Sequence, residues 1–454
     1  MSFLYSVIGF ILAIGVLVAV HEFGHFWVAR KLGVKVLTFS IGFGKPLWKK
    51  VAGPDQTEYV LAAIPLGGYV KMLGEGAYDY PIPEHELHRS FDRQPIWKRS
   101  LIVLAGPGIN FLFAILLFML LGMNTEKNLV PEFGDLPELS SLYQAGVVSG
   151  DTLVAVDGKP TRHLFEHDLY IFNQVLKRQS VELEVSGANG VRKVMVRTDQ
   201  IPIYNINPGS LMRQLGFVPI APPTTTAISG VSLGSPAEQA GLQAGDRFIS
   251  IDNVRISSWR ELSEIVVPAA GKSLPIVIQR SGVELNFNIT PESREVNGQQ
   301  TGLLGVARAF TPYPDNQIIE FSRNPFQALQ YGTEKTWLMS SLTLRMLWKM
   351  VTLQVSHKNV NGPITIADVA GQAIQIGWET YVYVLAVISI SLGVMNLLPI
   401  PMLDGGHLLM YVVEAAAGKN ISEKVFAIGQ RVGVLLLVCL MSLAFYNDIF
   451  RLLN

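Results

Sequence analysis

Four apolar stretches constrain the fold of this 454-residue chain more than any other feature. A helix needs roughly 20 apolar residues to cross a hydrocarbon core about 30 Å thick. The candidate spans are Phe3 to Val20, Leu101 to Met123, Tyr381 to Leu403, and Val425 to Tyr446 with Arg431 inside it. The mean hydropathy of +0.32, with 49% hydrophobic and 16% charged residues, is also typical of a membrane protein. We therefore expect a polytopic α-helical membrane protein with four transmembrane helices.

The loop after the first span indicates the orientation in the membrane. Six basic residues precede any acidic one there, namely Arg30, Lys31, Lys35, Lys45, Lys49 and Lys50. Because cytoplasmic loops are enriched in Lys and Arg, we expect this loop in the cytoplasm and the long stretch from Asn124 to Thr380 outside. The formal net charge of +0 gives no sign of a nucleic-acid partner. The single cysteine, Cys439, excludes an intrachain disulfide.

The outside stretch contains an internal repeat at an offset of 95 residues. Ala145-Gly146 matches Ala240-Gly241, and "SGDTLVAVDG" matches "AGDRFISIDN" with strand-like alternation. The second copy, "SPAEQAGLQAGDRFISIDN", resembles a PDZ domain, and the first copy is more divergent. We therefore expect two extracytoplasmic α+β PDZ-like domains. Such domains can bind peptide ends by strand addition, and the alternative is a spacer that binds nothing.

The first span ends in "HEFGH", which places two histidines and a glutamate on one helix. His21 and His25 are four residues apart, so both side chains can reach one ion. In the HExxH arrangement two imidazoles bind zinc and the glutamate, here Glu22, handles the proton of the attacking water. A glutamate inside a span is costly unless it faces a cavity or a partner, which favours the metal site over polar contacts between helices.

A catalytic zinc needs a third protein ligand. The far end of the third span reaches a similar depth, and spacing alone leaves two candidates there, Asp404 and His407. Pro399 and Pro401 should break the helix just before them. A second motif, "HLFEH" at His163 to His167, fits an inverted metalloprotease pattern, but we expect it to be a solvated face because the second repeat has no ligand at the equivalent place.

Two further segments predict structure near the membrane. Glu58 to Met72, "EYVLAAIPLGGYVKM", is typical of a strand, a Pro-Gly-Gly turn and a second strand, which predicts a membrane-associated β-hairpin. Its edge, at Leu61, Ala62 and Ala63, could pair with an unwound substrate, or the hairpin could merely cover the site. The segment from Asn324 to Val351 has helical apolar spacing and suits either a helix at the membrane surface or a buried helix of the outside region.

Together these motifs resemble the site-2 protease family of intramembrane zinc metalloproteases over nearly the whole chain. The family's second motif, N-x-x-P-x-P-x-L-D-G, is present at Asn396 to Gly405, and "GPGIN" at Gly106 to Asn110 resembles its motif in the second span. "GFGKP" departs from the family pattern by the insertion of Lys45. The resemblance implies Asp404 as the third zinc ligand, and substrate contacts at Asn396, Pro399, Pro401 and the β-loop.

The resemblance also implies a function, a location and partners. It implies a zinc metalloendopeptidase of a bacterial inner membrane, with PDZ-like domains in the periplasm and the active site towards the cytoplasm. The implied substrates are single-span membrane proteins, such as an already clipped anti-sigma factor or remnant signal peptides, in contact with membrane lipid. The alternatives are an inert membrane scaffold whose PDZ-like pair binds envelope peptides and, less favoured, a metal transporter.

The expected organisation follows from these segments. It comprises a membrane part with the HExxH motif and the β-loop at 1–123, PDZ-like domains at 124–220 and 221–312, surface helices at 313–378, and the last two spans at 379–454.

Overall fold

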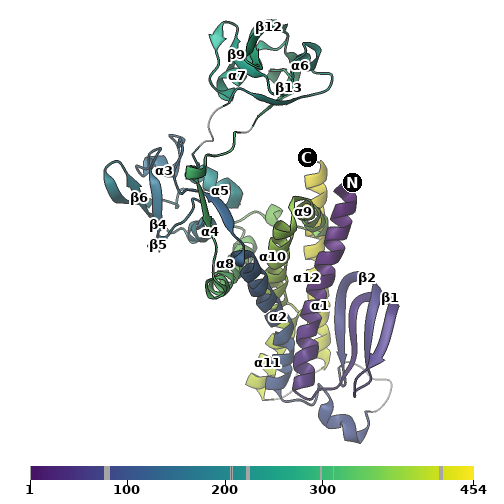
Figure 1. Cartoon of the computed structure of the whole chain (residues 1–454). Helices are drawn as coiled ribbons and strands as arrows, with labels where there is room; N and C mark the ends of the chain where they lie inside the picture. The colour runs from purple at the N-terminus through teal and green to yellow at the C-terminus, as the bar shows by residue number, and fades with distance from the viewer. Residues whose placement is uncertain are drawn as a thin grey trace.

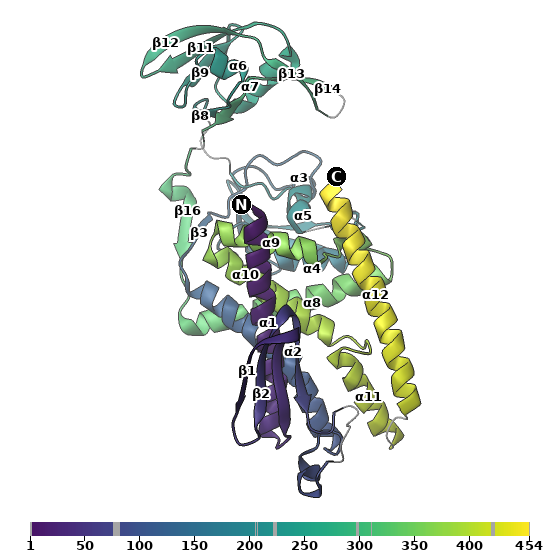
Figure 2. The same ribbon diagram turned by 90° about the vertical axis from the view of Figure 1, so that its right-hand side faces the viewer.

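The computed structural model describes residues 2–75, 82–204, 206, 208–220, 225–296, 299–309, 311–418 and 423–453. Within these ranges four helices are long and apolar enough to cross a membrane, as predicted. They are α1 (Ser2–Lys31), α2 (Ile96–Met123), α10 (Trp378–Asn396) and α12 (Glu423–Leu453). Both chain ends lie at the end of the bundle that faces the two repeat units (Figures 1 and 2).

Small residues let the helices of the bundle approach closely. A Cβ on Gly24 of α1 would collide with the carbonyl of Ala105 on α2, so the HExxH helix packs backbone to backbone against the second span. Between α2 and α10, the hydroxyl of Ser389 donates a hydrogen bond of 2.8 Å to the carbonyl of Asn110. The segment that carries the two histidines is therefore held at a fixed distance from α2.

The third span is shorter than predicted. The sequence predicts an apolar span to Leu403 with a break of the helix at Pro399 and Pro401, whereas α10 already ends at Asn396 and an irregular segment leads to a further helix, α11 (Asp404–Ala417). Prolines at 399 and 401 lack the N–H that a continuing helix would need, which explains the break. Met402 has a φ of 86°, an unusual conformation for a residue with a side chain. The turn there brings Asp404 to the first position of α11.

The loop between α1 and α2, in which a hairpin was predicted at Glu58 to Met72, forms a larger sheet. β1 (Val36–Ala52) and β2 (Thr57–Met72) each contain two strand segments. Segment 38–41 pairs with 58–61 on one side and with 68–71 on the other, while 48–52 pairs with 57–61. The predicted pairing between the two halves of Glu58 to Met72 is therefore wrong, because β1 lies between them. Gly42 and Gly44, both with positive φ, bend β1 at "GFGKP".

The long region between α2 and α10 contains two units with the same strand order, which we name the first repeat unit (130–220) and the second repeat unit (225–309). The order is β5-β4-β6-β7 in the first and β10-β9-β11-β12 in the second. The first contains α3 (Ser141–Gln144), β4 (Thr152–Val156), β5 (Lys159–Pro160), α4 (Asp168–Leu176), β6 (Val181–Gly187), β7 (Gly190–Val196) and α5 (Pro208–Leu215). The second contains β8 (Ile228–Val231), α6 (Pro236–Gln239), β9 (Arg247–Ile251), β10 (Val254–Arg255), α7 (Trp259–Val266), η2 (Val267–Ala269), β11 (Leu274–Arg280), β12 (Val283–Ile289), β13 (Glu292–Val296), β14 (Gln299–Leu303) and β15 (Val306–Arg308).

Equivalent buried aspartates stabilise the turn before the first long strand in both units. Asp151 accepts a hydrogen bond of 2.9 Å from the N–H of Val148, and Asp246 accepts one of 2.8 Å from the N–H of Gln243. Each aspartate also forms an ion pair with an arginine, Arg192 in the first unit and Arg280 in the second. The offset of 95 residues thus corresponds to a repeated structure, although the arginines come from opposite strands of the following hairpin.

The predicted domain boundaries are only partly described. Residues 221–224, next to the boundary predicted at 220, lie outside the described residues. The chain enters and leaves the repeat units through a short two-stranded stem, β3 (Glu126–Leu129) paired with β16 (Ile318–Phe321). The region predicted as surface helices at 313–378 therefore begins with η3 (Asp315–Gln317) and this stem strand, and continues with α8 (Pro325–Val351), η4 (His357–Asn359) and α9 (Pro363–Ile376).

Helix α8 links the first repeat unit to the second span. Gly332 packs against the backbone of α2 at Ile115, whereas Leu342 is buried in the hydrophobic core of the first repeat unit. Trp337 and Trp348 are exposed, at 76% and 66%. The helix therefore combines features of both predicted alternatives, because it packs on the repeat unit and still presents aromatic side chains outward.

The last helix, α12, contacts the segment "NGPIT" (residues 361–365) at the start of α9. The buried carboxylate of Asp448 on α12 accepts hydrogen bonds from the N–H groups of Gly362, Ile364 and Thr365, at 2.8 to 3.2 Å. These N–H groups have no partner within their own helix, so a carboxylate at this place stabilises the helix start. The remaining short helix, η1 (Glu84–Arg89), lies in the loop between β2 and α2.

Candidate metal centre

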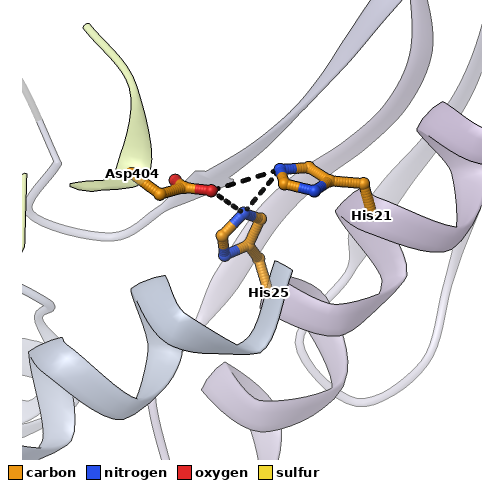
Figure 3. A group of neighbouring side chains, drawn as sticks. All are labelled: His21, His25 and Asp404. Carbon is orange, nitrogen blue, oxygen red and sulfur yellow. Dashed lines mark hydrogen bonds and ion pairs between the residues drawn. The ribbon is translucent and has the colours of Figure 1, made fainter. Parts of the chain in front are cut away.

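Three side chains from the two ends of the chain converge next to α2 (Figure 3). Nε2 of His21 lies 3.2 Å from Nε2 of His25, and Oδ2 of Asp404 lies 3.3 Å and 3.4 Å from these two nitrogens. The two histidines come from successive turns of α1, and Asp404 begins α11. The structure thus brings together the three residues predicted as metal ligands, whereas His407 is not part of this triangle.

The triangle fits a zinc ion. Nitrogen and oxygen ligands held tetrahedrally at about 2.0–2.1 Å from zinc lie about 3.3 Å apart, which is the spacing of these three atoms. Oδ2 of Asp404 is buried and has no hydrogen-bond partner among the described residues. Buried acceptors of this kind usually have a partner, so the orphaned oxygen facing two imidazole nitrogens is itself a sign of a cation site.

The backbone of α2 fixes the orientation of His25. Nδ1 of His25 lies 2.8 Å from the carbonyl of Ile102 and can only donate to it, so the lone pair of a neutral ring is on Nε2. Pro107 in the same part of α2 has no N–H, so it cannot donate the helical hydrogen bond to the carbonyl of Val103. Metal-binding histidines typically donate a hydrogen bond from the ring nitrogen that does not bind the metal, as Nδ1 of His25 does here.

Gly106 of α2 provides the space in which both imidazoles lie. A Cβ at this position would collide with the ring of His25 and would lie 2.8 Å from Cε1 of His21. The sequence motif "GPGIN" contains Gly106, but the motif does not indicate what this glycine does. The signal was present in the "GPG" stretch inside an apolar helix, since glycine and proline are poor helix formers and need a reason to be there.

A cavity of about 600 Å³ extends from the metal triangle towards the sheet. Its lining includes Glu22, Asn396 and four residues of one strand segment, namely Gly68, Tyr69, Val70 and Met72. Gly68 lies directly against Glu22, since a Cβ on Gly68 would be 2.8 Å from Cγ of the glutamate. The cavity therefore places a carboxylate, the three candidate metal ligands and a strand edge around one space.

The other predicted substrate contacts lie elsewhere. Leu61 pairs with both Ile41 and Trp48, and Ala62 pairs with Pro46, so the expected free edge at Leu61, Ala62 and Ala63 is corrected to the segment 68–72. Pro401 packs its carbonyl against Gly433 of α12, and neither it nor Pro399 is among the residues that line the cavity. Asn396 remains the predicted contact of this group that faces the cavity.

The "HLFEH" motif does not assemble a metal site. The ring of His163 stacks on Phe321, and burial lowers the pKa of His163. Glu166 forms an ion pair with Arg162, and Nε2 of His167 lies 3.0 Å from the carbonyl of Pro160. Each of the three side chains thus has a separate partner, and His163 is half-buried against Phe321 instead of lying on the solvated face that the sequence predicts.

Comparison with known proteins places this site in a family. Residues 9–440 match the model of peptidase family M50. The chain is 38% identical over 453 residues to the regulator of sigma-E protease RseP of Escherichia coli and 39% identical over 456 residues to the protease RseP of Yersinia pestis, with 100% of each chain covered. Among solved structures, a PDZ domain of an SdrC-like protein from Listeria monocytogenes covers 20% of this chain and 90% of its own length, with 20% identity and a TM-score of 0.17. The match over nearly the whole chain, with the metal triangle and Glu22 in place, shows that the chain belongs to peptidase family M50 and is a zinc metalloprotease of the site-2 protease type.

Proposed function

We propose that this protease cuts single-span membrane proteins within the membrane, with Glu22 as the catalytic proton carrier and His21, His25 and Asp404 as the zinc ligands. The observation that carries the proposal is the metal triangle beside a strand edge, in a cavity between membrane-spanning helices. The substrates we propose are an already clipped anti-sigma factor or remnant signal peptides. The intact ligand set and Glu22 speak against an inert scaffold.

The chemistry follows from the positions of these side chains. When bound, zinc supplies a water that is acidic near neutral pH and polarises the scissile carbonyl. Glu22 lines the same cavity as His21, His25 and Asp404, and it would accept a proton from the attacking water. The same carboxyl group would then return the proton to the leaving nitrogen. Asn396 would hold the substrate backbone through its side-chain amide.

A substrate helix must be opened before it is cut, because its carbonyls are engaged in its own hydrogen bonds. We propose that segment 68–72 holds the opened substrate by strand pairing. Leu73 donates its N–H to the carbonyl of Lys35, on the side of β1. Since N–H groups alternate along a strand, those of Gly68 and Val70 point to the opposite side, towards the open edge, whereas the N–H of Met72 donates to Oε2 of Glu75 at 3.1 Å. In this proposal segment 68–72 pairs with the substrate, in place of the predicted edge at Leu61, Ala62 and Ala63.

The charge of the loop between α1 and α2 supports the orientation proposed for the membrane. We propose that this loop is cytoplasmic, which puts both repeat units and both chain ends in the periplasm of a bacterial inner membrane. With a rise of 1.5 Å per residue, His21 is about 27 Å along α1 from Phe3, so the site would lie towards the cytoplasmic side. Membrane lipid would surround the exposed apolar faces of the bundle.

We propose that the two repeat units are PDZ-like domains and act as a size filter for substrates. They share one strand order and one aspartate-stabilised turn. The second unit stands beyond the first one, away from the bundle (Figure 2). A bulky substrate domain on this side would meet the units before its span reached the cavity. Exclusion of this kind needs no peptide binding, and peptide binding in a groove is the competing role.

One experiment tests the proposed function directly. The purified protein is reconstituted in vesicles with a membrane-spanning peptide, and cleavage is measured with its natural zinc content, after chelation and after zinc is returned. We expect cleavage within the span, its loss with the chelator and its return with zinc. Glu22→Gln serves as the control for a contaminating protease. Cleavage that persists in this variant, or that occurs only outside the span, would overturn the proposal.

A further inference from the structure

Asn110 is a fully buried polar residue of α2 that the proposed chemistry does not use. Its side chain is 0% exposed, and its amide nitrogen is placed 3.0 Å from Nδ1 of His21. Its side-chain oxygen, Oδ1, has no hydrogen-bond partner among the described residues. One end of the Asn110 amide therefore faces the metal ligand, and the other end is unpaired.

The amide can face His21 in two ways, because its oxygen and nitrogen have nearly the same shape. If the NH₂ group faces His21, Nδ1 must carry the lone pair, and a neutral ring then has its proton on Nε2. That proton would point into the triangle with His25 and Asp404. If Oδ1 faces His21, Nδ1–H donates to it, and the lone pair is on Nε2.

Metal binding decides between the two orientations. A histidine that binds a metal through Nε2 has its proton on Nδ1, and that proton would meet the hydrogens of an NH₂ group 3.0 Å away. Rotation of the amide by 180° changes this repulsion into a hydrogen bond without moving any other atom. The protonation of Nδ1 of His21 therefore favours one orientation of the amide over the other.

We propose that Asn110 is a positioning residue that accepts a hydrogen bond from Nδ1–H of His21 and thereby sets the zinc affinity of the site. The carbonyl of Ile102 accepts from His25 in the same way at 2.8 Å, so α2 orients both histidines, once with its backbone and once with a side chain. The inference depends on the metal site and not on the proposed substrates.

The test compares acceptors and non-acceptors at position 110. Zinc affinity is measured on the full-length protein by competition with a chromophoric chelator. We expect Asn110→Leu to weaken zinc binding by about 10- to 100-fold, the usual effect of losing such a partner. Asn110→Asp, which can accept but not donate, should bind zinc at least as tightly as the natural protein. Zinc at saturating concentration should restore most of the cleavage rate of Asn110→Leu.

Ser389→Ala is the matched control, because it removes the hydroxyl that donates to the backbone carbonyl of Asn110 and leaves the amide in place. We expect its zinc affinity to be unchanged. Natural affinity in Asn110→Leu would overturn the proposal, as would a well-folded Asn110→Asp that binds zinc as weakly as the leucine variant. If the buried carboxylate prevents folding, Asn110→Ser supplies a smaller acceptor, and a serine variant no better than leucine would also overturn it.

Discussion

Gly106 of α2 faces the ring of His25 so closely that a single added carbon would occupy the place of the imidazole. A Cβ there would overlap the ring of His25 and lie 2.8 Å from Cε1 of His21, on the neighbouring turn of α1. Two residues along α2, Gly108 has nothing within 4 Å of an added Cβ. The same motif thus contains one glycine that is required by the site and one that is not.

Gly106→Ala should therefore displace the metal ligands, while Gly108→Ala should not. We expect the first variant to lose zinc and cleavage together, and the second to keep both, since alanine is otherwise the better helix former. Zinc content of the purified proteins and cleavage in vesicles measure the two effects. A Gly106→Ala protein with full zinc occupancy would show that α2 can move away at little cost.

The roles within the cavity predict a separation between metal binding and catalysis. Replacement of His21, His25 or Asp404 by Ala should lower zinc content and abolish cleavage, because each removes one ligand. Glu22→Gln should retain zinc and lose cleavage, because glutamine cannot carry the proton. If Asp404→Ala kept its zinc while His407→Ala lost it, the third ligand would be His407.

The open strand edge predicts a dependence on one backbone donor. Val70→Pro removes an N–H that points to the open side, whereas Val70→Ala shortens the same side chain and keeps the donor. We expect the proline variant to cut a stable substrate helix much more slowly than the alanine variant. With a substrate loosened by Gly or Pro in its span, the two variants should differ less. An equal loss for both substrates would indicate misfolding of the sheet.

The size-filter role predicts a gain of activity when the second repeat unit is removed. Among the described residues, those that form its hydrophobic core or pack against it all lie between 228 and 306, so deletion of 225–309 should leave the rest folded. The core of the first unit, by contrast, includes Leu342 of α8. We expect the deletion protein to cut a substrate that still has its folded outside domain. A protein that is active on clipped substrate but refuses the full-length one would contradict the filter.

The buried ion pair of the second repeat unit predicts a local dependence on pH. Hydrogen bonds from the Arg280 guanidinium lower the pKa of Asp246. A lowered pKa in the folded state stabilises the unit above the unfolded pKa of about 3.9, and this stabilisation is lost as the pH falls through the folded pKa. At pH 7, Asp246→Asn should cost about 2 kcal/mol and speed amide exchange in this unit roughly 30-fold. The difference should shrink at pH 3, and Asp151→Asn, the equivalent change in the first unit, should leave the second unit unaffected.

Helix patterns in the sequence predicted most of the membrane part, because length and hydropathy decide whether a helix can span. The HExxH spacing likewise predicted that His21 and His25 share a face. Strand pairing was harder to predict from the sequence. The local pattern of Glu58 to Met72 contains no information about segment 38–41, which lies between the two halves of this stretch in the sheet. The bend at Gly42 and Gly44 was the available signal.

The surroundings of the metal were hidden for a different reason. The carbonyl of Ile102 has no sequence signature, and the need for Gly106 arises only when two helices cross at that point. Spacing could not choose between Asp404 and His407, which are three residues apart on one helix. Arg192 and Arg280 form ion pairs with the equivalent aspartates of the two repeat units, but they come from different strands. Alignment of the two repeats at an offset of 95 residues therefore could not match them.

The distance in sequence between the metal ligands has a consequence for biosynthesis. His21 and Asp404 are separated by 383 positions (404 minus 21). At a synthesis rate of about 5–20 residues per second, roughly 20 to 80 seconds pass between the emergence of the first ligand and the last. During that interval α1 and α2 can already be in the bilayer, but the third ligand does not yet exist. With these three side chains as the zinc ligands, as proposed above, a nascent chain that ends before Asp404 cannot cleave neighbouring membrane proteins at the site of insertion, and proteolytic competence arises only after Asp404 has been synthesised.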